Sequence, residues 1–173
     1  MDLELFKYRL AIFDIDGTLT EIKPAVREKQ PRLVTPKQLG EQQPITGVIE
    51  KLDAIKTTGL GLALATNRGG VAFGYTTLEE AKALAQEAAD LCGISDASIY
   101  VCPYHAKARG KRAVKEFARE SDCRKPNAGM LFQALAEHAV MPEQAFFVGD
   151  RETDRQAAGN AGIDFFWAAD FFG

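Results

Sequence analysis

Residues 10–20 read Leu10-Ala11-Ile12-Phe13-Asp14-Ile15-Asp16-Gly17-Thr18-Leu19-Thr20 and join an apolar run to a glycine turn. The run predicts a buried strand over 10–14, and the period of two along a strand points Asp14 and Asp16 in the same direction. Two carboxylates this close raise the pKa of one of them unless a cation joins them. Oxygen ligands suit Mg²⁺, which leaves room for substrate phosphate, and a carboxylate can also form an aspartyl-phosphate. The alternative is a strand that ends in an ordinary Asp-Gly turn, and the rest of the chain decides between the two.

The bulk properties indicate one globular domain. The chain has 173 residues, so we expect a single domain over 1–173 with a sizeable core. Hydrophobic content of 46% and charged content of 26% are ordinary for soluble proteins. No apolar run approaches the ~20 residues that span a bilayer, and the first seven residues do not resemble a secretory signal. Three cysteines, an odd number, argue against a disulfide framework and for a reducing compartment, so we expect a cytoplasmic protein.

Strand and helix patterns alternate along the chain. Short apolar runs predict five strands, at 10–14, 60–65, 97–101, 145–148 and 163–167. Helical periodicity predicts helices at 45–56, 77–91, about 110–120, 127–139 and 152–160. This alternation indicates an α/β fold, a doubly wound parallel sheet with helices on both faces. Residues 20–44 are polar, contain four prolines and show no sustained period, so we interpret them as a loop or flap.

Polar side chains suited to phosphate chemistry occur at the ends of the predicted strands. Ligands of doubly wound sheets bind at the carboxyl ends of the strands, so these side chains are expected to share one site with Asp14 and Asp16. The glycines after the second strand offer backbone donors, and a helix N-terminus favours anions. The side chains are, in chain order, Thr66, Asn67 and Arg68 after the second strand, Lys125 before a helix, Asp150 after the fourth strand, and Asp154.

Four motifs in this order resemble those of the haloacid dehalogenase-like (HAD) phosphohydrolase superfamily. They read Asp14-Ile15-Asp16-Gly17-Thr18, Thr66-Asn67, Lys125-Pro126 and Gly149-Asp150 with Asp154. The longer strings at 65–70, 123–130 and 147–154 are similar to the branch of histidinol-phosphate and heptose-bisphosphate phosphatases. The resemblance covers nearly the whole chain, and it implies a Rossmann-like fold with a small flap and no large cap domain.

The resemblance also implies a role for each residue. Asp14 would attack phosphorus, and Asp16 would protonate the leaving oxygen and then activate the hydrolytic water. Mg²⁺ would lie between Asp14, the backbone carbonyl of Asp16, and Asp150, while Asp154 would orient the water shell of the metal or cap a helix. The phosphate oxygens would be held by Thr66, Asn67, Arg68 and Lys125, of which Thr66 and Lys125 count as catalytic.

Phosphatases of this branch often carry a zinc loop that this sequence matches only in part. The loop places Cys-x-His and Cys-x-Cys ahead of the lysine motif, but Tyr104 and Ser121 stand at two of the ligand positions here. Cys102, His105 and Cys123 supply at most three ligands, whereas a structural zinc site needs four. We therefore expect the protein to fold and work without zinc.

Residues 107–125 carry eight basic and three acidic side chains, a charge of +5 against −8 for the remainder. A solvated helix face is one interpretation. Attraction of a nucleic-acid end is another, because the phosphatase domain of polynucleotide kinase resembles this arrangement, but the segment has no obvious series of interleaved aromatic residues for stacking bases. We therefore predict a small phosphorylated metabolite such as a sugar phosphate, with a polynucleotide 3′-phosphate as the alternative.

Two other functions use the same residues. A phosphotransferase would pass the phosphoryl group to an alcohol other than water, and a phosphate-binding module would bind without turnover. Every catalytic residue type is present, so nothing in the motifs supports a phosphate-binding module without turnover. No membrane partner is expected. The oligomeric state stays open, with a homodimer as one option, because members of the superfamily with small caps either act on larger substrates or borrow a neighbouring subunit to close the site.

Overall fold

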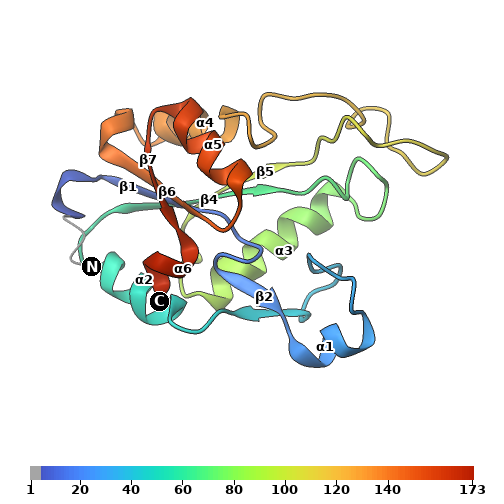
Figure 1. Ribbon diagram of the computed structural model, residues 1–173, viewed down its shortest axis with the longest axis horizontal. Coiled ribbons are helices and arrows are strands. Elements are labelled where there is room, and N and C mark those ends of the chain that lie inside the picture. Colours follow the sequence, from blue (N-terminus) through green and yellow to red (C-terminus); the bar gives the residue numbers. More distant parts are fainter. Residues whose placement is uncertain (1–4) are drawn as a thin grey trace.

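The computed structural model describes residues 5–173 and contains a five-stranded parallel sheet between two layers of helices (Figure 1). The α/β doubly wound fold is thus confirmed. The central strands are buried along their whole length, which is why they read as continuous apolar runs. The strands, in spatial order, are β5 (Ser98–Cys102), β4 (Gly61–Asn67), β1 (Leu10–Phe13), β6 (Ala145–Gly149) and β7 (Asp164–Trp167). Residues 1–4, part of the stretch from which we argued against a secretory signal, lie outside the described residues.

Helices cover both faces of the sheet, and alternate residues of β1 contact opposite layers. Ala11 and Phe13 pack with the layer of α2, α3 and α6, while Leu10 and Ile12 pack with α4 and α5 (Figure 1). The period of two along a strand explains this division. The helices are α2 (Val48–Lys56), α3 (Leu78–Leu91), α4 (Gly129–Glu137), α5 (Glu152–Ala161) and α6 (Ala168–Phe172), with 3₁₀ turns at Leu5–Lys7 and Pro142–Gln144.

Residues 20–44, which we call the flap, carry regular structure that the sequence pattern did not predict. Strands β2 (Thr20–Ile22) and β3 (Gln42–Pro44) pair in antiparallel fashion around the short helix α1 (Pro24–Lys29). Each element is too short to show a period. The buried Gln42 side chain accepts a hydrogen bond from Thr20 Oγ1 at 3.0 Å and donates one to the Leu84 carbonyl at 2.8 Å. These bonds fasten the base of the flap to α3.

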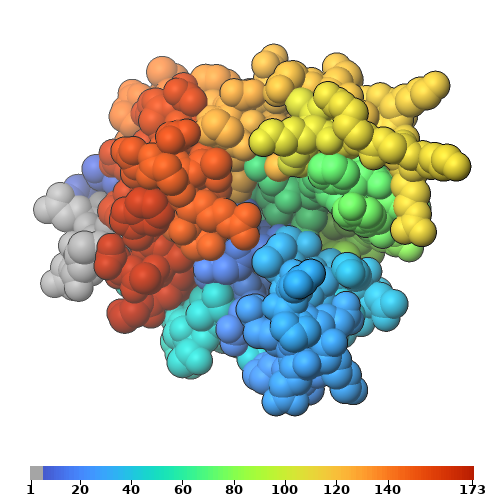
Figure 2. Space-filling view, turned by 45° about the vertical axis from the view of Figure 1, so that its right-hand side comes forward, coloured from blue at the N-terminus to red at the C-terminus, as the bar shows by residue number. Residues whose placement is uncertain are grey.

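The helix predicted at about 110–120 is wrong. Residues 103–124, which we call the basic lobe, form turns and loops between β5 and α4 and project from the same side of the molecule as the flap (Figure 2). A backbone hydrogen bond ties the lobe to another segment, since the Val114 N–H donates to the Ala72 carbonyl at 2.9 Å, and a second lies within the lobe, where the His105 N–H donates to the Phe117 carbonyl at 3.0 Å. These contacts replace the hydrogen bonds within a helix that the local amphipathic pattern suggested.

The cysteines also depart from expectation. Cys102, at the end of β5, forms a disulfide with Cys123 of the basic lobe, and their Cα atoms lie 5.6 Å apart. Our argument from an odd cysteine count was therefore wrong for this pair, because the count says nothing about which segments lie side by side. Cys92 is buried and unpaired, as expected of a small core residue. Among residues 5–173, no helix combines the length and apolar character that a membrane span requires.

Candidate active site

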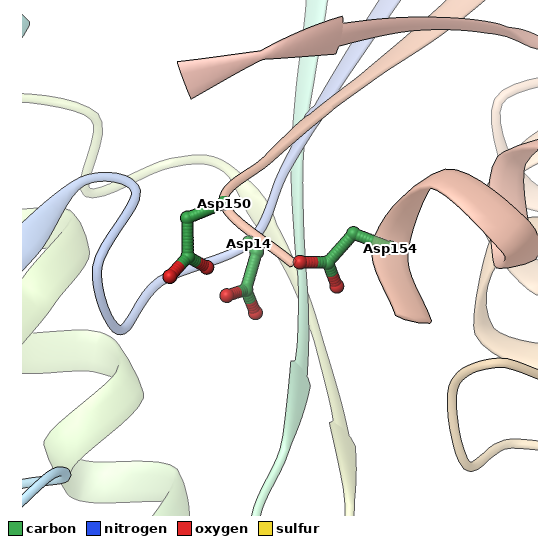
Figure 3. Close-up of side chains that lie close together, drawn as sticks. All are labelled: Asp14, Asp150 and Asp154. Carbon is green, nitrogen blue, oxygen red and sulfur yellow. The ribbon is translucent and has the colours of Figure 1, made fainter. Parts of the chain in front are cut away.

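Three carboxylates converge at the carboxyl edge of the sheet. Asp14 follows β1, Asp150 follows β6 and Asp154 lies in the first turn of α5, and each offers an oxygen within 4.8 Å of the others (Figure 3). Strands β1 and β6 are adjacent, with Phe13 paired to Val148, and the Asp14 N–H donates to the Val148 carbonyl at 2.9 Å. The order of strands thus brings together aspartates that are far apart in the sequence.

Lys125 neutralises part of this cluster. Its buried Nζ lies 2.7 Å from Asp14 Oδ1 and 2.7 Å from Asp154 Oδ1, and it donates to the Ala65 carbonyl at 2.9 Å. Burial by itself lowers the pKa of Lys125, but the two carboxylates outweigh it and raise the pKa above its usual value. The lysine therefore stays charged and holds the Asp14 carboxylate in place.

Asn67 holds Lys125 through the backbone. Its side-chain amide donates to the Lys125 carbonyl at 3.0 Å, and its carbonyl oxygen accepts from the Lys125 N–H at 3.1 Å. The Asn67 side chain is thus engaged in positioning the lysine, and only its backbone remains available for a phosphate. Thr66, one residue earlier in β4, is buried. The sequence could not reveal the Asn67–Lys125 contact or the Ala65 contact, because the partners are 58 and 60 residues apart.

Asp16 lies outside the acidic cluster and pairs with Arg68. Its Oδ2 is 3.1 Å from the Arg68 Nη1, and both side chains are buried. Burial raises the pKa of Asp16 to about 6, although the Arg68 charge opposes the shift. The ion pair is poorly directed, since none of the three guanidinium nitrogens of Arg68 makes a hydrogen bond. Native proteins rarely bury donors without a partner, so Arg68 is poised to receive an anionic ligand.

Asp154 and Asp150 differ in their contacts and in their exposure to solvent. Asp154 Oδ2 accepts the Arg151 N–H at 3.0 Å and so caps α5, while its other oxygen pairs with Lys125. Asp150 is more exposed, and burial together with the Asp14 charge raises its pKa. A Cβ on Gly17, which has φ +89°, would lie 2.5 Å from Asp150 Oδ2. Only glycine leaves room for this carboxylate in the turn after Asp16.

The charge of the site is unbalanced. Four carboxylates, those of Asp14, Asp16, Asp150 and Asp154, face two buried cations, Lys125 and Arg68. Arg151, 3.7 Å from the exposed Asp150, is a third and more distant cation. Crowded carboxylates without a matching positive charge are costly, and a divalent cation would offset the excess negative charge. Oxygen-only ligands match Mg²⁺. The cluster of Asp14, Asp150 and Asp154 therefore fits a magnesium ion.

Comparison with known proteins identifies the family. The HAD-hydrolase-like family model matches residues 122–169. Over 162 residues the chain is 36% identical to the D-glycero-β-D-manno-heptose-1,7-bisphosphate 7-phosphatase of Pasteurella multocida, a match that covers 88% of this chain and 77% of the relative. The chain belongs to the HAD-like phosphatases.

Two further similarities support this assignment. This HAD-like phosphatase is 37% identical over 121 residues to the 7-phosphatase of the same name from Haemophilus influenzae, a match that covers 65% of the chain and 60% of the relative. The crystal structure of the D,D-heptose 1,7-bisphosphate phosphatase from B. bronchiseptica, complexed with magnesium and phosphate, covers 91% of the chain and 78% of that protein with a TM-score of 0.70. At 22% sequence identity, the similarity to the B. bronchiseptica structure shows a shared fold and no more. Membership of the superfamily and the enzyme class predicted from the motifs are confirmed.

Proposed function

We propose that this HAD-like phosphatase is a Mg²⁺-dependent hydrolase of a small phosphorylated metabolite, specifically a sugar phosphate. The observation that carries the proposal is the Asp14 carboxylate, which Lys125 holds at 2.7 Å beside Asp150 and Asp154 at the ligand-binding edge of the sheet. The names of the relatives, which are heptose-bisphosphate phosphatases, support a phosphorylated sugar. We take residues 1–173 as one catalytic domain whose flap covers the leaving-group side.

In the proposed mechanism Asp14 is the nucleophile. Lys125 engages its Oδ1, so Oδ2 attacks phosphorus, and a bond from Asp14 to phosphorus forms as the bond to the leaving oxygen breaks. Asp16 gives its proton to the leaving oxygen and then takes a proton from the water that attacks the aspartyl-phosphate. Hydrolysis releases phosphate and restores Asp14. Mg²⁺ held by Asp14 and Asp150, with Asp154 beside them, would neutralise charge on the phosphate oxygens.

The direct test is an assay of phosphate release from a panel of sugar phosphates with Mg²⁺. We expect turnover of at least one sugar phosphate, loss of that turnover with EDTA and recovery when Mg²⁺ is added in excess. A chelator-resistant activity would contradict the metal assignment. No release from any phosphomonoester, in protein shown to be folded by circular dichroism, would contradict the hydrolase itself.

Replacing Asp16 with Asn should slow the hydrolysis of sugar phosphates far more than that of an aryl phosphate. A general acid contributes about 10²–10⁴-fold only where the leaving oxygen needs a proton, and an activated phenolate does not. The measurement compares kcat/KM for p-nitrophenyl phosphate and for the best sugar phosphate. Equal losses on the two substrates would show that Asp16 is not the acid.

Replacing Arg68 with Gln should raise KM and the inhibition constant of inorganic phosphate by about 10- to 100-fold, because a charge-assisted hydrogen bond to phosphate is lost. Stability should fall as well, because the change leaves the buried Asp16 carboxylate without its cation, so the constants are measured in protein shown to be folded. Arg68→Lys keeps the charge without the forked geometry and should recover part of the loss. An unchanged phosphate constant with a lower melting temperature would instead indicate a structural role.

A polynucleotide 3′-phosphate is the second candidate, favoured by one observation. The structure places the aromatic rings of Phe73 and Tyr75, from the segment after β4, beside the basic lobe. Phe73 and Tyr75 stack with ring centroids 5.6 Å apart, Phe73 lies 4.9 Å from the His105 ring, and the Tyr75 side chain is exposed. Exposed aromatic rings beside basic side chains are features of proteins that bind single strands.

Neutralising Lys111, Arg112 and Lys115 together separates the two substrate classes. If the lobe attracts a polyanion, turnover of an oligonucleotide 3′-phosphate should fall, and the loss should shrink as salt rises. If the substrate is a small metabolite, its kcat/KM should change by less than about twofold, because exposed lobe charges are screened. We expect the second result. A large, salt-sensitive loss on oligonucleotides, with no sugar phosphate turned over, would favour the nucleic-acid function.

A further inference from the structure

The loop that carries the proposed acid closes on itself through Thr20, the first residue of β2. The Gly17 N–H donates to the Thr20 carbonyl at 2.8 Å, and Asp16 and Thr20 form an isolated backbone bridge. Asp16 also lines a pocket of about 200 Å³ between the flap and the start of α5, with Arg27 and Arg151 in its walls. A shift of the buried Thr20 would therefore move Asp16 relative to a bound substrate.

Gln42, on the neighbouring strand β3, holds Thr20 against α3. Its side chain is fully buried, and its amide nitrogen donates to the Leu84 carbonyl at 2.8 Å and to Glu87 Oε2 at 2.7 Å. Its amide oxygen accepts the Thr20 hydroxyl at 3.0 Å. The orientation of the amide is fixed, because a carbonyl and a carboxylate can only accept hydrogen bonds and so require the nitrogen to face them.

Glu87 extends this connection to a second point of the flap. Its other carboxylate oxygen accepts the Gly40 N–H, so one side chain of α3 binds both Gly40 and Gln42. Helix α3 is a firm support, since Ala85 and Ala88 on its buried face pack in the same core cluster as β1. An apolar side chain could fill the space of Gln42 without the cost of burying an amide. The hydrogen bonds add what apolar contact lacks, a defined direction toward Thr20.

We propose that Gln42 is a positioning residue that sets the place of Asp16 at the leaving oxygen, acting through Thr20. The inference rests on the proposed function, in which Asp16 is the general acid. An acid must lie within about 2.6–3.2 Å of the oxygen that it protonates, and a displacement of about 1 Å can cost about 100-fold in rate. When the Gln42 amide is removed, the Ile45 N–H still donates to the Leu19 carbonyl at 2.9 Å, so the loop should shift without unfolding.

The first test compares two leaving groups. The measured quantity is kcat/KM for the best sugar phosphate divided by kcat/KM for p-nitrophenyl phosphate, with Mg²⁺, in wild type and Gln42→Met. We expect this ratio to fall about tenfold or more, because only the sugar leaving group needs a proton from a well-placed acid. Gln43→Met is the matched control, since Gln43 is the next residue of β3 and its amide donates to Glu21 instead of α3. The control should leave the ratio unchanged.

A double variant distinguishes positioning from a general loss of stability. Gln42→Glu places two carboxylates side by side and should lower the ratio at least as much as Gln42→Met. Adding Glu87→Gln restores an amide–carboxylate hydrogen bond and keeps an acceptor for the Thr20 hydroxyl, so the double variant should recover part of the loss. Glu87→Gln alone removes one acceptor from a half-buried side chain and should lower the ratio about threefold. This variant carries the test if Gln42→Met does not fold.

Amide hydrogen exchange tests the same contacts without turnover. The N–H groups of residues 17–20 all donate within the loop, and we expect them to exchange about tenfold faster or more in Gln42→Met, with exchange in β6 unchanged. If no phosphomonoester is turned over but exchange in the loop rises, the positioning contacts stand and the hydrolase fails. The inference is overturned by equal losses on the two substrates, by no recovery when Glu87→Gln is added, by unchanged exchange in the loop, or by the same effects in Gln43→Met.

Discussion

Replacing Asp14 with Asn should lower phosphatase turnover by about four orders of magnitude or more, as loss of a nucleophile does in other covalent mechanisms. The amide keeps the shape of the side chain but removes the attacking oxygen and one metal-binding charge. Folding should survive, because the change also removes one of four crowded carboxylates while Lys125 retains Asp154 at 2.7 Å. A large loss of activity without loss of structure is therefore the expected result.

The experiment measures kcat on the best sugar phosphate and on p-nitrophenyl phosphate, with the melting temperature recorded for each protein. Asp96→Asn is the matched control, because Asp96 is exposed and distant in the chain from the four site motifs. The control should keep full activity. Turnover by the Asp14→Asn protein above a few per cent of wild type on either substrate would mean that another group attacks phosphorus.

Replacing Lys125 with Met should abolish turnover and also destabilise the protein. The buried Nζ contacts Asp14 and Asp154, and its removal leaves two carboxylates without their cation. Breaking a buried ion pair on one side costs on the order of 3–5 kcal/mol. Mg²⁺ should restore more stability to this variant than to wild type, since it would supply the missing positive charge to the same carboxylates.

Urea unfolding with and without Mg²⁺ measures this effect. Lys115→Met is the control, since Lys115 is an exposed lysine of the basic lobe, and its free energy of unfolding should stay within about 0.5 kcal/mol of wild type. An unchanged stability of Lys125→Met would show that the acidic cluster does not depend on the lysine. Equal stabilisation of variant and wild type by Mg²⁺ would argue that the ion binds away from Asp14 and Asp154.

Local patterns predicted the elements of the sheet because their causes are local. A strand buried on both faces needs consecutive apolar residues, as in β1 and β6. A helix that packs on one face of the sheet needs apolar residues with a period of about 3.6, as in α3. The start of α3 also has a local cause, a capping box formed by two residues three positions apart. The Thr77 side chain accepts the Glu80 N–H at 3.1 Å, and the Glu80 carboxylate accepts the Thr77 N–H at 2.8 Å.

The basic lobe shows where local reasoning fails. Residues 110–120 have the amphipathic pattern of a helix, but the Val114 N–H bonds to Ala72 and Phe117 packs against Tyr104 with ring centroids 5.4 Å apart. The Cys102–Cys123 disulfide closes the lobe at its base. Contacts with segments remote in sequence override helix propensity when they satisfy the backbone N–H and C=O groups that a helix would otherwise pair. No local sequence pattern predicts such contacts.

By itself the sequence determined the class of fold from its alternating strand and helix patterns and the family from its four motifs. It also indicated the residues of the candidate site, because the carboxyl ends of parallel strands share one edge of the sheet. Only the tertiary structure decided which charges pair. Lys125 meets Asp14 across 111 residues, Arg68 faces the Asp16 side chain, and Arg27 of the flap approaches the same pocket as Arg151. Ion pairs depend on distances of a few ångströms between segments, and those distances follow from the order of the strands and the path of the loops, which residue spacing alone does not encode.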